Sequence, residues 1–193
     1  MSEKIALISL GCPKNLINSE QMLFLLAEAG YTLVPDPDGA DVAVVNTCGF
    51  IDSAKSEAID VILSLAALKE AGQLQRIVVC GCLSQRYRAE LREELPEVDA
   101  IVGVGSFSEI VAAVRGALAG EKPELFGDIN APVDETGRAV STGPGWAYVK
   151  IADGCDNPAL SAPSPPSAGA IVPARWRPSW KNAAALRKAA CGK

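Results

Sequence analysis

The sequence predicts an α/β fold in which a parallel sheet is covered by helices on both faces. Short, continuous apolar runs rich in β-branched residues occur at residues 42–45 (VAVV) and 76–80 (RIVVC), a pattern typical of strands buried on both faces. Each run is followed by a longer segment with helical periodicity, such as residues 53–70. Strands that alternate with helices of this length favour a parallel sheet.

The elements follow in order through the first 120 residues. A helix over residues 18–30 would turn Met22 and Leu26 inward and end at Gly30, a common helix stop. The turn PDPDG at residues 35–39 leads into the central strand. Strands are expected at residues 4–10, 31–34, 42–45, 76–80 and 99–104, and helices at 18–30, 53–70, 85–95 and 107–118.

The regular pattern stops after residue 120. Residues 121–145 are dominated by Gly, Pro, Asp and Thr and predict an interdomain linker. Residues 146–151 (WAYVKI) predict the first strand of a second domain, of which residues 146–157 would be a remnant. Residues 158–193 are rich in Pro and Ala and contain no acidic residue, so we expect a disordered, aberrant tail.

Charge and hydropathy exclude several classes of protein. The 193 residues are 49% hydrophobic, enough for one α/β domain with an appendage. No signal peptide opens the chain and no run of 18 apolar residues occurs, so we expect a cytoplasmic protein without a membrane partner. Six of the 18 basic residues lie in residues 157–193, which leaves 12 basic against 23 acidic residues in residues 1–156. Direct nucleic-acid binding by such an acidic body is not expected.

The chain has six cysteines and no histidine. In a cytosolic protein, cysteines more often bind metal or react than form disulfides. The lack of histidine excludes histidine-based catalytic triads and mixed cysteine–histidine zinc sites.

Cys12, Cys48 and Cys82 each follow a predicted strand beside a glycine. Parallel strands lie about 4.8 Å apart, so three such thiols can meet at one edge. Three thiolates suit a 4Fe–4S cluster with one open iron.

Other interpretations of these cysteines stay open. A single cysteine at a strand end is often only a small buried apolar residue, and a zinc site would need a fourth ligand. Cys80 lies inside a predicted strand and is expected to pack in the core. Glu20, Asp52 and Ser53 are candidates for groups that support the thiols, although Asp52 and Ser53 equally suit helix capping.

Three motifs carry a resemblance to a known family. GCPKNLINSE at residues 11–20, NTCGFIDSAKSEAID at 46–60 and GCLSQRY at 81–87 resemble the radical-SAM methylthiotransferases. The residues after Cys12 and Cys48 resemble the RimO-type branch, which modifies an aspartate of a ribosomal protein, more than the tRNA-modifying MiaB-type branch. The resemblance covers about residues 1–157. It implies a flavodoxin-like sheet, an auxiliary 4Fe–4S cluster on Cys12, Cys48 and Cys82 that carries the sulfur to be transferred, and a ribosomal protein substrate.

The sequence departs from this family after residue 157. The family uses C-x-x-x-C-x-x-C to hold a second 4Fe–4S cluster that binds S-adenosylmethionine. Cys155 matches the first position, but the other two are Ala159 and Ala162, and Cys191 has no matching spacing. We therefore expect neither S-adenosylmethionine nor the second cluster to bind here, and we assign no catalytic residue. The resemblance implies an inactive methylthiotransferase fragment.

A one-base deletion after Asn157 is our hypothesis for this change. To test it on the protein sequence, the first two bases of each codon are taken as the second and third bases of a codon in the shifted frame. From Ala159 onward, synonymous codon choices then permit CAFCAIPSIRGRYRSRPMEALVE, which is the string that the family places here. The DNA across the codons for Asn157 to Gly169 tests this hypothesis.

Two other functions stay open: a stand-alone iron–sulfur or persulfide carrier, and a structural or interaction domain without iron.

Overall fold

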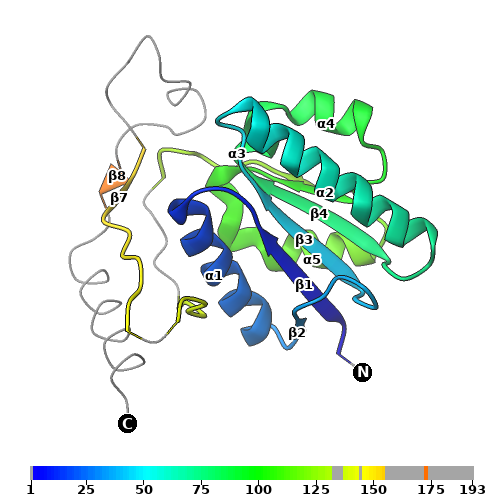
Figure 1. The fold of residues 1–193 in the computed structure, drawn as a ribbon, viewed down its shortest axis with the longest axis horizontal. Helices are drawn as coiled ribbons and strands as arrows, with labels where there is room; N and C mark the ends of the chain where they lie inside the picture. The colour runs from blue at the N-terminus through cyan, green and yellow to red at the C-terminus, as the bar shows by residue number, and fades with distance from the viewer. Residues whose placement is uncertain (1, 132–136, 144, 155–171, 174–193) are drawn as a thin grey trace.

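A six-stranded parallel sheet organises the computed structural model, which describes residues 2–131, 137–143, 145–154 and 172–173 (Figure 1). The strand order is β2-β1-β3-β4-β5-β6, and every neighbouring pair is parallel. This is the flavodoxin-like order extended by one strand, so the predicted fold class is confirmed.

The strands are β1 (Lys4–Ser9), β2 (Thr32–Val34), β3 (Val42–Thr47), β4 (Arg76–Gly81), β5 (Ala100–Val102) and β6 (Glu124–Leu125). The helices are α1 (Pro13–Glu28), α2 (Asp52–Glu70), α3 (Cys82–Arg86), α4 (Arg88–Glu94), the 3-10 helix η1 (Val104–Glu109) and α5 (Ile110–Leu118).

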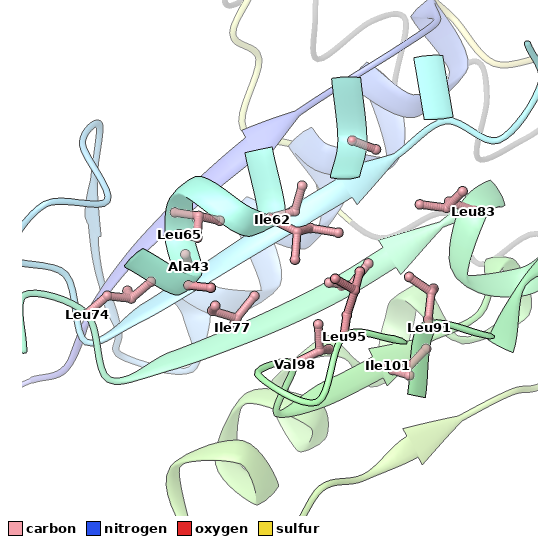
Figure 2. Packing of buried hydrophobic residues seen from close by; sticks show 14 of the residues in the cluster. Ala43, Ile62, Leu65, Leu74, Ile77, Leu83, Leu91, Leu95, Val98 and Ile101 are labelled. Atoms are coloured by element: carbon pink, nitrogen blue, oxygen red, sulfur yellow. The ribbon is translucent and has the colours of Figure 1, made fainter. Parts of the chain in front are cut away.

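Helices cover both faces of the sheet, because alternate strand residues point to opposite sides. On one face, α1 and α5 pack on residues such as Val44 and Val78. On the other face, α2, α3 and α4 pack on Ala43, Ile77 and Ile101 (Figure 2). All six residues of β3 are buried, which explains the continuous apolar run that the sequence shows there. The rigid sheet therefore fixes where each connecting loop begins.

The first helix begins five residues earlier than predicted. Pro13 is its first residue and Cys12 its N-cap, an arrangement that suits proline because the first helical N–H needs no partner. The helical pattern was not visible there because the buried face is polar: Asn15, Asn18, Ser19 and Glu20 are each about 1% exposed. A search for apolar periodicity cannot find a helix that buries amides and a carboxylate.

Two further differences lie beyond residue 120. Glu124–Leu125, inside the predicted linker, forms β6 beside β5, and the Arg88 and Arg92 guanidinium groups hold Glu124 at 2.6 and 2.8 Å. The predicted strand at residues 146–151 is wrong. A strand needs a neighbour, and the structure instead pairs β7 (Ala152–Asp153) antiparallel with β8 (Val172–Pro173). The rest of the predicted tail lies outside the described residues.

Residues 137–143 and 145–150 lie along α1 (Figure 1). Ser141 donates to Glu20 Oε1 through its N–H (2.7 Å) and its hydroxyl (2.8 Å). Arg138 Nε forms an ion pair with Glu20 Oε2 at 2.8 Å, and Lys150 Nζ donates to Asn18 at 2.6 Å. The polar face of α1 is thus buried by a segment more than a hundred residues away in sequence. Within the described parts of the chain, no helix has the length and apolarity needed to span a membrane.

Candidate metal centre

The strand register places the loops of the three candidate cysteines at one edge of the sheet. β1, β3 and β4 are direct neighbours, and Asn46 of β3 is paired with Ser9 of β1 and with Cys80 of β4. Cys48 and Cys82 therefore stand at equivalent positions, each two residues beyond a paired residue, and Cys12 stands three residues beyond Ser9. The strand order reverses between β1 and β3, the place where open α/β sheets bind ligands.

Glycines allow these loops to touch. Gly11 has φ +96°, and a Cβ there would lie 2.6 Å from Cys48 Cβ and 3.3 Å from Cys48 Sγ. A Cβ on Gly49 would lie 3.0 Å from Cα of Leu83 and 3.2 Å from the carbonyl carbon of Cys82. The first loop thus packs against the second and the second against the third, so the backbone brings all three cysteines into one neighbourhood.

The three thiols differ in exposure. Cys12 is exposed, Cys82 is half-buried and Cys48 is 9% exposed. The Cys12 thiol lies 4.0 Å from Asn15 Oδ1. Among the residues that the structure describes, no three cysteine or carboxylate side chains are arranged as a ready metal-binding group. The loops are therefore in contact, but their sulfurs would have to turn toward one another to share a metal cluster.

Cys80 is a core residue, as predicted. It is fully buried, with its sulfur 3.8 Å from Met22 Sδ and 3.4 Å from the Val45 carbonyl oxygen. Burial, with a smaller contribution from the charge of Cys82, raises the pKa of the Cys80 thiol far above its usual range. The thiol stays neutral near pH 7, which disfavours Cys80 as a metal ligand.

The candidate supporting groups have other partners. Glu20 binds Ser141 and Arg138. Asp52 is in the first turn of α2 and forms an ion pair with Lys55 at 2.5 Å, and hydrogen bonding to Lys55 lowers the pKa of Asp52. The N-cap of α2 is Ile51, without a side-chain cap, so neither Asp52 nor Ser53 is the N-cap residue.

Sequence patterns missed two amides that contact the cysteine loops. Asn15 and Asn46 are buried and bonded to each other's elements: Asn46 Nδ2 donates to the Asn15 carbonyl oxygen at 2.9 Å. The signal available in the sequence was only their position, three residues after Cys12 and two before Cys48. The predicted loss of the second cluster motif stays a prediction, because Cys155, Ala159, Ala162 and Cys191 lie outside the described residues.

Comparison with known proteins finds one matching family and a set of similar proteins that share one name. Residues 4–103 match the family described as "Uncharacterized protein family UPF0004". The ribosomal protein uS12 methylthiotransferase RimO of Pelotomaculum thermopropionicum is 49% identical over 158 residues, which are 81% of this chain and 36% of that protein. The RimO protein of Desulforamulus reducens is 50% identical over 155 residues, 79% of this chain and 35% of that protein. The chain spans about a third of the length of these curated relatives.

Proposed function

This chain belongs to the UPF0004 family and has RimO-type methylthiotransferases among its relatives, and from this premise we propose that residues 1–120 are an auxiliary-cluster domain. In this proposal Cys12, Cys48 and Cys82 hold a 4Fe–4S cluster. The observation that carries it is the register: three thiols follow three adjacent parallel strands at one sheet edge. The domain would serve a methylthiotransferase that acts on a ribosomal protein, as the relatives' name states.

The residues at this edge fit such a group. Thiolates are the protein ligands of 4Fe–4S clusters, and three of them leave one iron with an open position. That iron would supply the place where the sulfur to be transferred is held. Gly11 and Gly49 leave no side chain between the loops. Cys12 is exposed, so an incoming sulfur donor or acceptor can reach this edge from solvent.

Anaerobic reconstitution with iron and sulfide tests the proposal. The wild-type chain is expected to hold about four irons, and the triple variant Cys12/Cys48/Cys82→Ala is expected to hold none above background. Iron and sulfide are assayed per chain after removal of unbound metal. Equal iron in the wild type and the triple variant would refute the ligand assignment.

We also propose that this chain does not cleave S-adenosylmethionine by itself. Cys155 stands alone where the family uses three cysteines, because positions 159 and 162 are alanine. A single thiolate cannot hold a cluster that leaves one iron free for the substrate. Reconstituted, reduced protein incubated with S-adenosylmethionine is expected to release no 5′-deoxyadenosine by chromatography. Release above that of the triple variant would contradict the proposal.

A stand-alone iron–sulfur or persulfide carrier is the second candidate function. Two features of the sequence favour it. Cys12, Cys48 and Cys82 could still bind sulfur or a cluster, whereas Ala159 and Ala162 replace cysteines that the family needs for radical chemistry. A reconstituted protein that passes its cluster intact, iron and labelled sulfide together, to the cysteines of an apo-acceptor protein would support an iron–sulfur carrier. A protein loaded as a persulfide that passes its labelled outer sulfur to an acceptor thiolate, and is left with its own thiolate, would support a persulfide carrier. Among the described residues, the cysteines at positions 12, 48, 80 and 82 form no disulfide, which fits the proposed cytoplasmic location.

A further inference from the structure

The amide of Asn15 joins the loops that carry Cys12 and Cys48. Its Nδ2 donates to the carbonyl oxygen of Leu10, the first residue after β1, and to that of Thr47, the last residue of β3. Both distances are 3.0 Å. Its side chain is about 1% exposed. Because these carbonyls lie two residues before Cys12 and one before Cys48, a single buried side chain fixes both loops relative to each other.

Asn46 extends this connection to the third loop. Its Nδ2 donates to the Asn15 carbonyl oxygen (2.9 Å) and to Ser19 Oγ (2.9 Å). Its Oδ1 is buried without a hydrogen-bond partner among the described residues and lies against Gly81. A Cβ on Gly81, which has φ +103°, would be 2.6 Å from that oxygen and 2.4 Å from the Thr47 carbonyl oxygen. The backbone just before Cys82 is therefore packed directly on the Asn46 amide.

We propose that Asn15, supported by Asn46, is a positioning residue that holds the three cysteine loops together before any metal binds. The two amides contact backbone that lies one or two residues before each of the three thiols, and they are buried where an unbonded carbonyl cannot reach water. The consequence for iron rests on the proposed function. The consequence for loop geometry does not, and it can be measured on the metal-free chain.

The test compares alkylation of two cysteines in the same metal-free, reduced protein. Iodoacetamide labelling of Cys48 and Cys80 is followed by peptide mass spectrometry. In Asn15→Leu, the Cys48 loop loses the hydrogen bond from Asn15 Nδ2 to the Thr47 carbonyl oxygen, and Cys48 labelling is expected to rise about tenfold, while Cys80 in the core keeps its rate. The matched control is Asn18→Leu, equally buried on the same helix but bonded to Lys150, and it should leave the Cys48 rate unchanged. Asn15→Ser is the second variant if the leucine variant does not fold.

Three results would overturn the inference: a wild-type Cys48 rate in both Asn15 variants, parallel acceleration of Cys48 and Cys80, or the same acceleration in Asn18→Leu. In reconstituted protein, loss of a group that supports metal ligands is expected to weaken iron retention about 10- to 100-fold, measured as the rate of iron transfer to a chelator. A wild-type chain that takes up no iron would refute the proposed function, and the labelling experiment would still decide the role of Asn15.

Discussion

Cys82→Ala is expected to lose most of the reconstituted iron, whereas Cys80→Ala, two residues earlier, is expected to keep it. Cys82 is half-buried at the strand exit, and Cys80 is fully buried inside β4. A cluster that loses one of three thiolates is left with two, too few for a stable 4Fe–4S cluster with one open iron. Iron and sulfide content per chain, with the visible absorption of the cluster, measures the difference.

The unfolding free energies of the same two variants should rank the other way round: Cys80→Ala, which keeps its iron, is expected to be the less stable protein. Cys80→Ala removes a sulfur packed against Met22 and is expected to cost about 1 kcal/mol of unfolding free energy in the metal-free protein, as small truncations of core side chains do. Cys82→Ala should stay within about 0.5 kcal/mol of the wild type. Denaturant titration measures both values. Iron lost from Cys80→Ala but retained by Cys82→Ala would reverse the assignment of ligand and core residue.

Glu20→Gln is expected to release residues 137–143 from α1. The Glu20 carboxylate is about 1% exposed, accepts two hydrogen bonds from Ser141 and pairs with Arg138. The glutamine side chain has nearly the same shape but leaves the Arg138 charge without its counterion. Breaking a buried ion pair costs about 3–5 kcal/mol, and each 1.4 kcal/mol is about tenfold in an equilibrium. Amide hydrogen exchange of Ala139 and Ser141, both bonded to Glu20, should therefore accelerate about 100-fold or more.

Glu28→Gln provides the control for that experiment. Glu28 is an exposed residue at the end of the same helix, so its neutralisation changes the helix charge without touching residues 137–143. Amides of β3 should keep their protection in both variants, because the sheet core does not involve Glu20. Unchanged exchange at Ala139 and Ser141 in Glu20→Gln would show that this ion pair does not hold the segment in place.

The sheet was predictable from sequence because its two central strands contain the apolar runs 42–45 and 77–80, which are buried on both faces. The same property placed Cys12, Cys48 and Cys82 after neighbouring strands, and the observed strand order confirms that placement. Iron binding by these thiols stays a prediction. The expected core role of Cys80 is confirmed by its complete burial.

The missed features depend on partners that are remote in sequence. The start of α1 was hidden because Asn15 and Glu20 on its buried face are polar, and only the structure shows the groups that bind them. Residues 146–151 have the composition of a strand, yet Trp146 and Ile151 are exposed. Strand propensity depends on a neighbouring strand to pair with. Asn15 and Asn46 were missed because their hydrogen-bond partners lie about thirty residues away in sequence.

Iron anomalous diffraction from crystals of the reconstituted chain tests the central claim most directly. It locates the metal without reference to any sulfur position. The account predicts one compact iron density at the carboxyl ends of β1, β3 and β4, within bonding distance of the sulfurs of Cys12, Cys48 and Cys82. Iron bound elsewhere, or bonded to fewer than these three sulfurs in a fully loaded crystal, would contradict it.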